Sequence, residues 1–153
     1  MSKKLTAIIK NISERELLSA VIWGGIGICN LISFFSSLPV ILIFTLGFGL
    51  PLLLPTLALG IWGLIMAISH FKKSKKILNP TPETIETYYN SNNNIIISVI
   101  LLFVCGSQTF SLLAFICALC DTYFIRGYVL ENKELFDKEI RTVGVEVETI
   151  ETE

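Results

Sequence analysis

The chain has 153 residues, of which 52% are hydrophobic and 16% are charged, and its mean hydropathy is +0.68. A soluble domain has about 25% charged residues, and a chain this short buries only about two-thirds of its surface, so the composition argues against a water-soluble globule. The formal net charge of −1 and the pI near 5.9 argue against a nucleic-acid partner.

Two long stretches without charged side chains predict that the chain enters a membrane. Between Glu16 and His70 the sole ionisable side chain is a cysteine, and none of Asp, Glu, Lys, Arg or His occurs between Ile95 and Cys120. A helix needs about 20 apolar residues to cross a hydrocarbon core of ~30 Å, and both stretches are longer. We therefore predict an all-α integral membrane protein with about four membrane-embedded helical segments in two hairpins. A buried helical core in a soluble protein is the alternative.

Residues 1–16 are predicted to form an interfacial or cytoplasmic N-terminus. Apolar side chains recur there on one helical face, which is typical of a short helix on the membrane surface; a disordered tail is the alternative. These apolar positions are Leu5, Ile8, Ile9 and Ile12. Ser13 and Glu16 have the spacing of a capping box, which predicts that a new helix begins at this point.

Residues 17–71 are predicted to form the first membrane hairpin. Its first helix is expected over about 17–35, and the sequence Ser-Ser-Leu-Pro at 36–39 favours a turn. Proline lacks a backbone donor, so the glycines and prolines that follow predict an irregular entry to the second helix. That helix is expected to begin with Pro51 in its first turn, where a missing donor costs little, and to end at Phe71.

Residues 72–94 are predicted to form a hydrophilic cytoplasmic linker. The sequence Lys-Lys-Ser-Lys-Lys at 72–76 is expected to end the preceding helix, and Asn-Pro-Thr-Pro at 79–82 predicts a loop. Residues 84–89 are expected to add one helical turn, with its tyrosines at the level of the lipid headgroups.

Residues 95–125 are predicted to form a second membrane hairpin. One straight helix of this length would measure about 46 Å, which is too long for a hydrocarbon core of ~30 Å. The polar sequence Gly-Ser-Gln-Thr at 106–109 divides the stretch into a short arm, 95–105, and a longer arm, 110–125. A single tilted helix that continues into the tail is the alternative.

Residues 126–153 are predicted to form a cytoplasmic tail. Residues 128–141 place apolar side chains among alternating charges, which predicts a weakly amphipathic helix. From Thr142 onward the glutamates meet no basic residue, so this last segment is predicted to be disordered.

The distribution of basic residues predicts the orientation of the chain. All 12 lysines and arginines lie in residues 1–16, 72–94 and 126–153. Short basic flanks stay on the cytoplasmic side of a membrane, so two hairpins would place all three segments in the cytoplasm. A single crossing within 95–125 would instead put the tail outside.

Cys117 and Cys120 form a CxxC motif, and Asp121 follows it directly. Such a pair can be redox active, because one thiol pKa is lowered and the second thiol resolves a mixed disulfide. Residues 117–123 resemble the arrangement in the vitamin K epoxide reductases and the DsbB family of quinone-linked thiol oxidases, which implies a membrane thiol oxidoreductase. Those families also use a second cysteine pair in an extracytoplasmic loop, and this sequence has none. Helix packing or S-acylation is the alternative role for the two cysteines.

Asp121 is a carboxylate next to an apolar arm, and an acid inside a membrane is a candidate proton or ion site. The alternative is a place in the headgroup zone or a pair with Arg126. Cys117, Cys120 and Asp121 are thus the candidate site residues, and no catalytic set is assigned. His70 lies beside lysines without a second ligand nearby, so no metal site is predicted, and no cofactor motif is found.

The glycines of the apolar stretches predict close helix packing, either within the chain or between copies of it. Two apolar hairpins with every polar segment on one side resemble the reticulon layout, which implies membrane shaping. The sequence favours a non-enzymatic multi-pass protein that acts by contacts within the bilayer, as an accessory subunit or a membrane-shaping element. A thiol oxidoreductase and a small transporter or channel component are the alternatives. The scarcity of ionisable residues within the apolar stretches argues against the transporter.

Overall fold

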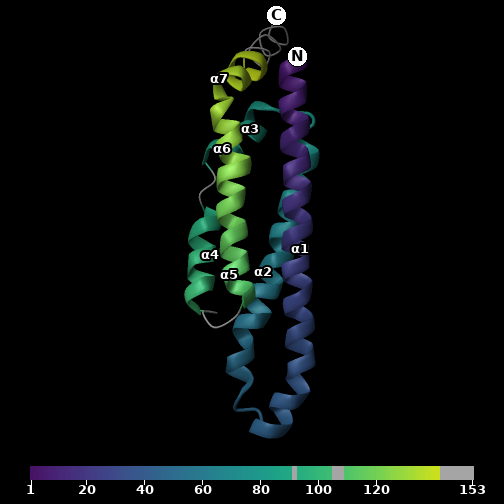
Figure 1. The fold of residues 1–153 in the computed structure, drawn as a ribbon, viewed down its shortest axis with the longest axis vertical. Helices are drawn as coiled ribbons and strands as arrows, with labels where there is room; N and C mark the ends of the chain where they lie inside the picture. Colours follow the sequence, from purple (N-terminus) through teal and green to yellow (C-terminus); the bar gives the residue numbers. More distant parts are fainter. Residues whose placement is uncertain (91–92, 105–108, 142–153) are drawn as a thin grey trace, which may run out of the picture.

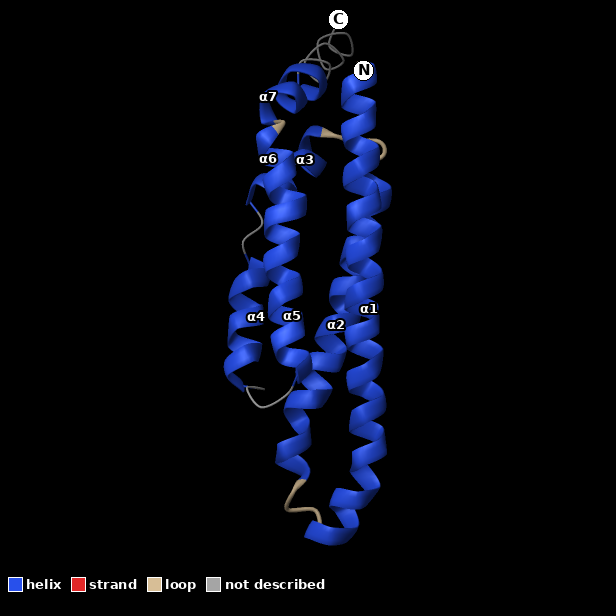
Figure 2. Cartoon of the chain, viewed as in Figure 1, coloured by secondary structure: helices blue, strands red, loops and turns tan. Residues whose placement is uncertain are grey.

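The computed structural model describes residues 1–90, 93–104 and 109–141, and every regular element in them is helical (Figure 2). This confirms the all-α prediction. The elements are α1 (Lys3–Thr45), α2 (Leu50–Lys76), α3 (Pro82–Asn90), α4 (Asn93–Val104), α5 (Thr109–Cys120), the π-helical segment η1 (Asp121–Arg126), α6 (Gly127–Glu131), α7 (Lys133–Phe136) and the π-helical segment η2 (Asp137–Arg141).

Three helices are long and apolar enough to cross a membrane. They are Lys3–Thr45, Leu50–Lys76 and Phe110–Glu131, the last of which runs through α5, η1 and α6. Most of their apolar surface faces outward, as expected of helices whose solvent is lipid. The length and composition of these helices indicate a multi-pass membrane protein.

Residues Lys3–Thr45 form one helix of 43 residues, which corrects two predictions. Ser2 caps α1 by accepting a hydrogen bond from the Leu5 amide, whereas Ser13 lies inside the helix and donates its hydroxyl to the Ser74 carbonyl 2.8 Å away. The capping box at Ser13 was therefore wrong. The turn expected at 36–39 was also wrong, because α1 continues through Pro39.

The chain reverses at residues 46–49, between α1 and α2. Leu46 and Gly47 both have positive φ, 49° and 88°, which ends α1 with a left-handed cap. Pro51 lies in the first turn of α2, as predicted. The helix continues past its predicted end at Phe71 and ends within the lysine run, at Lys76. Lys73, Lys75 and Lys76 form its last turn, where the negative end of the helix dipole favours positive charge.

The remaining helices complete an elongated bundle (Figure 1). Instead of the single turn expected at 84–89, α3 spans Pro82–Asn90. Helices α4 and α5 pack against each other. Because α4 ends at Val104 and α5 begins at Thr109, the polar break predicted at 106–109 lies largely outside the described residues. From α5 the chain continues through η1, α6, α7 and η2 to Arg141, so residues 128–141, predicted to form one helix, are helical on both sides of a break at Asn132. The acidic segment from Thr142 onward also lies outside the described residues.

One end of the bundle gathers the segments that are polar in the sequence. The N-terminus, α3, α6 and α7 lie together there (Figure 1), and Ser2 donates its amide and hydroxyl to the Glu139 carboxylate at 2.6 and 2.5 Å, which holds the pKa of Glu139 below its usual value. The apolar face of residues 1–16, expected to lie on the membrane surface, packs into a hydrophobic core at this end of the bundle instead. The buried residues of this core are Leu5, Ile8, Ile9, Ile12, Ile77, Ile85, Tyr88, Ile125, Val129, Phe136 and Ile140.

Glycines bring the backbones of α1 and α2 into contact in the middle of the bundle. A Cβ atom placed on Gly63 would lie 2.7 Å from the Gly27 amide nitrogen, and one placed on Gly27 would lie 2.8 Å from the Leu64 nitrogen. At these positions the predicted close packing occurs within the chain, because any side chain would force the two backbones apart.

Candidate functional site

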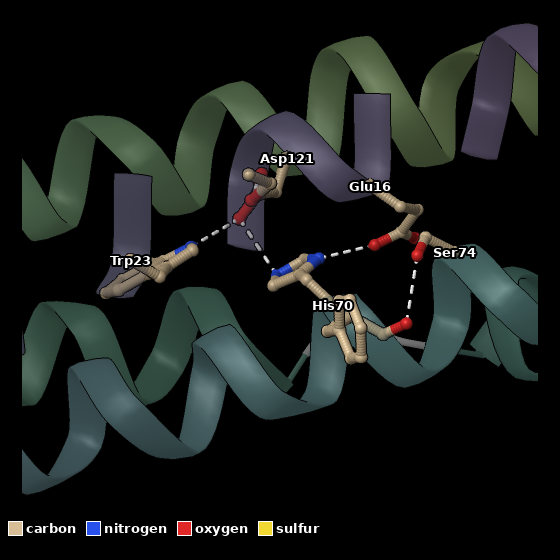
Figure 3. Close-up of polar contacts among 7 residues, drawn as sticks. Glu16, Trp23, His70, Ser74 and Asp121 are labelled. Atoms are coloured by element: carbon tan, nitrogen blue, oxygen red, sulfur yellow. Dashed lines mark hydrogen bonds and ion pairs between the residues drawn. The ribbon is translucent and has the colours of Figure 1, made fainter. Parts of the chain in front are cut away.

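Three ionisable side chains meet inside the bundle, each contributed by a different helical element. Glu16 comes from α1, His70 from α2 and Asp121 from the start of η1 (Figure 3). His70 Nδ1 lies 2.5 Å from Glu16 Oε2, and His70 Nε2 lies 3.2 Å from Asp121 Oδ2. The exposed fractions of the three side chains are 1% for Glu16, 3% for His70 and 14% for Asp121. We refer to these three residues as the buried cluster.

Neighbouring polar groups satisfy the Asp121 carboxylate. The Ser19 hydroxyl donates to Oδ1 at 2.5 Å, and the Trp23 indole Nε1–H donates to Oδ2 at 2.8 Å. Both donors lie on α1 on the side that carries Glu16, because residues three, four and seven positions apart share one face of a helix. This single face of α1 therefore contacts α2 through Glu16 and η1 through Ser19 and Trp23.

The geometry indicates the charge state of the buried cluster. Carboxylate oxygens are acceptors, and each nitrogen of the His70 ring faces one. A ring with a hydrogen on both nitrogens would hydrogen-bond Glu16 through Nδ1 and lie at ion-pair distance from Asp121 through Nε2, so the arrangement fits an imidazolium cation between two carboxylates. Burial makes each charge costly on its own, and the three are compensated only together.

Tyr88 closes the cluster from the side of α3. Its side chain is buried at 3% exposure. Burial, and after it the negative charge of Glu16, raises the pKa of the Tyr88 hydroxyl, so this group stays protonated. A neutral phenol beside Glu16 adds no further negative charge to the site.

The sequence analysis selected one member of the buried cluster, Asp121, and not the other two. Asp121 was singled out from the sequence, but its ion pair is with His70, whereas Arg126 donates to the carbonyls of Tyr88 and Tyr89 at 3.1 and 2.9 Å. The sequence reasoning missed Glu16, which was assigned to a helix cap, and His70, which was assigned to a helix end without a partner. The expectation that few ionisable residues are buried was thus wrong in this region.

A signal for the cluster is nevertheless present in the sequence. Glu16, His70 and Asp121 are each the first charged or titratable residue other than cysteine at the edge of a long apolar stretch. Where such stretches fold back on one another in hairpins, these edges come to the same level of the bundle. A search for partners among the edge residues would have paired them.

Cys117 and Cys120 lie on α5 beside the buried cluster, in a groove of about 310 Å³. Asp121, Ser19 and Arg15 also line this groove. Cys117 is half-buried and Cys120 is exposed, and no disulfide joins the cysteines of the described residues. The structure therefore places all three sequence-predicted candidates at one groove, with Asp121 as the link to the cluster. Among the described residues, no group of His, Cys, Asp and Glu side chains is arranged to hold a metal ion.

Replacing both Cys117 and Cys120 with alanine is expected to leave the protein inserted and abundant. The thiols contribute apolar contacts to the groove and none of the hydrogen bonds of the buried cluster, so their loss removes little stabilisation. Quantitative blotting of membrane fractions checks this, and alkylation before lysis is expected to find both thiols reduced. Trapping either cysteine in a mixed disulfide with a protein substrate or a quinone-linked partner would contradict this expectation and favour the thiol oxidoreductase.

Comparison with known proteins gives no match: no protein-family model, curated protein or solved structure is similar to this chain. The role of the cluster therefore follows from its geometry. It joins α1, α2 and η1 at one level of the bundle.

Proposed function

We propose that this chain is a non-enzymatic, multi-pass protein that shapes the bilayer by contacts within it. The observation that carries the proposal is the unequal number of helices along the bundle axis. In the middle of the bundle α1, α2, α4 and α5 lie together, whereas among the described helices α1 and α2 continue to the end opposite the N-terminus (Figure 1).

The buried cluster gives a common reference point along the bundle axis from which the lengths of α1 and α5 can be compared. The hydrogen bond between Ser19 and Asp121 sets these two residues at one depth. From Ser19 to Thr45, α1 extends about 39 Å, whereas from Asp121 back to Thr109, α5 extends about 18 Å. The α4–α5 pair therefore accompanies roughly half of the α1–α2 pair, which supports a second hairpin that enters the bilayer without crossing it.

The far half of the α1–α2 hairpin carries large apolar side chains without partners in the described chain. Phe44 is 82% exposed and Phe48 is 88% exposed. Such a surface is stable only in contact with lipid or with another membrane protein. Four helices in one leaflet and two in the other make a wedge, and a wedge expands the leaflet that holds its wider end. An accessory subunit that uses this apolar surface to contact a protein partner or a second copy is the runner-up.

We further propose that the wide end of the wedge lies in the cytoplasmic leaflet. Residues 1–16, 72–94 and 126–153 would then be cytoplasmic, with the hairpins 17–71 and 95–125 in the bilayer. The basic residues of these segments support this orientation. The gathering of the N-terminus, α3 and α7 at one end of the bundle also supports it.

Tags placed at residue 2, near Thr84 and at residue 153 are expected to be reached by protease from the cytoplasmic side alone. Two hairpins return each polar segment to the side on which the chain began. Protease protection in sealed vesicles is the measurement. A tag at residue 153 that is protected while the tag near Thr84 is cleaved would indicate a single crossing in 95–125.

Reconstitution of the purified protein at high protein-to-lipid ratio is expected to convert large vesicles into tubules or small vesicles. Insertion of about eleven apolar residues on each side of residues 105–108 would extend α4 and α5 by about three turns each into the far leaflet and remove the wedge. That variant should leave vesicle diameter, measured by cryo-electron microscopy, close to the protein-free value. A Gly-Ser insertion of equal length adds no membrane helix and is the matched control, which should behave like the wild type.

The same vesicles distinguish shaping from proton transfer. Intramembrane acids and histidines also build proton relays, and Asp121 lines an open groove. If the protein acts by shape, vesicles loaded with a pH-sensitive dye keep their pH gradient while they deform. A proton leak without deformation would replace the shaping proposal by the transporter alternative.

A further inference from the structure

A basic pocket of about 310 Å³ lies between the end of α2 and α3, on residues that the buried cluster does not use. Three lysines of the last turns of α2 line it together with hydroxyl groups and one carboxylate. The lining residues are Ser69, Lys72, Lys73, Lys76, Glu83, Thr84 and Thr87.

The pocket holds an excess of positive charge. Within the described residues, no ion pair joins Lys72, Lys73 or Lys76 to Glu83 or to any other carboxylate. Lys73 Nζ lies 5.7 Å from the centroid of the Tyr88 ring, which orients this lysine toward α3. Because Thr87 donates its hydroxyl to the Thr84 carbonyl, the lysines carry most of the recognition of an anion.

The position of the pocket along the bundle points to the lipid surface. Its lysines belong to the last turns of a helix long and apolar enough to cross a membrane. Ile68 and Phe71, one turn before these lysines, are 55% and 45% exposed and apolar. The change from apolar to basic surface occurs where the acyl chains of a leaflet give way to its headgroups.

We propose that this pocket binds an anionic phospholipid whose headgroup carries a phosphomonoester. A phosphomonoester has a charge of about −1.5 to −2 near neutral pH, and three lysines opposite one glutamate leave a matching excess of positive charge. The acyl chains of such a lipid lie along the exposed apolar side of α2. A soluble phosphate compound lacks this apolar contact, so the lipid is the occupant that uses both surfaces.

The test measures binding of a fluorescent phosphatidic acid to the full-length protein in nanodiscs of zwitterionic lipid. Lys72→Gln/Lys76→Gln should weaken binding by about 30-fold, because each lysine loses its attraction to the headgroup. Lys3→Gln/Lys4→Gln removes the same charge from the first turn of α1, outside the lining of the pocket. This control should bind within about two-fold of the wild type.

A variant that binds more tightly is also needed, because misfolding could explain a loss of lipid binding but not a gain. Glu83→Gln removes the carboxylate that lines the pocket and should strengthen binding. Equal losses in the two lysine variants would mean diffuse surface attraction and overturn the proposal, as would an unchanged affinity in Glu83→Gln. Complete displacement of the lipid by millimolar inorganic phosphate would indicate a site for free phosphate and would also overturn it. These outcomes do not depend on whether the protein deforms vesicles.

Discussion

Replacing His70 with leucine is expected to lower the free energy of unfolding by about 3–5 kcal/mol. The substitution leaves the carboxylates of Glu16 and Asp121 buried without the cation that lies 2.5 and 3.2 Å from them. Both must then be protonated or drawn toward water, and either response pulls α1, α2 and η1 apart. Unfolding in mixed micelles, followed by tryptophan fluorescence, measures the change, because Trp23 bonds Asp121 directly.

The matched control removes every charge of the buried cluster at once. In Glu16→Met/His70→Leu/Asp121→Asn no ionisable group of the cluster remains. The amide that replaces the Asp121 carboxylate would keep an oxygen to accept from the Trp23 indole, and its NH2 group would donate to the Ser19 hydroxyl. Replacing a whole buried ion network by groups of similar volume is often neutral, so this triple variant should recover most of the lost stability. If His70→Leu alone has the unfolding free energy of the wild type, the cluster does not hold the three helical elements together. The proposed wedge would then lack the contact that joins its two hairpins.

Replacing Gly63 with alanine is expected to cost about 1–3 kcal/mol of unfolding free energy, because its new Cβ would overpack the α1–α2 interface. The atom would lie 2.7 Å from the Gly27 nitrogen and 2.8 Å from the Gly27 Cα, and neither is the end of a flexible side chain. The two helices must therefore separate along the contact that brings them closest. The same micelle titration measures the loss.

Gly25→Ala is the matched control for this interface. Nothing lies within 4 Å of a Cβ placed on Gly25, so the substitution gains helix propensity without a collision and should be neutral or stabilising by up to about 1 kcal/mol. Equal effects at the two glycines would show that helix propensity, and not the close approach of α1 to α2, governs stability at both positions.

The helical class and the apolar stretches of membrane-crossing length follow from the amino-acid sequence. Long runs without charge cannot be solvated as a small globule, so they must be helical and face lipid, whatever they pack against. The place of Pro51 in the first turn of α2 also follows from local sequence, because a proline at a helix N-terminus loses no hydrogen bond. The helix predicted within 128–141 followed from periodicity in the same way.

Tertiary structure decided where α1 ends and what its first turns contact. The local signals at Ser13 and Pro39 favoured a helix start and a turn, but α1 passes through both. Ser13 bonds α2 across the bundle. At Pro39 a continued helix leaves one hydrogen bond unmade, whereas a turn exposed to lipid would leave several backbone groups without partners. Local helix propensity contributes little to the free energy of folding when long-range contacts compete with it.

Tertiary structure alone also created the buried cluster. Glu16, His70 and Asp121 are 50 or more positions apart, and each resembles an ordinary interfacial residue when it is considered by itself. Their meeting requires two hairpins to pack with their polar edges at one level, a relation between segments that no local pattern encodes. Burial then makes each charge depend on its neighbours, and the hydrogen bond from Ser19 to Asp121 holds the start of η1 at the level of Ser19 on α1.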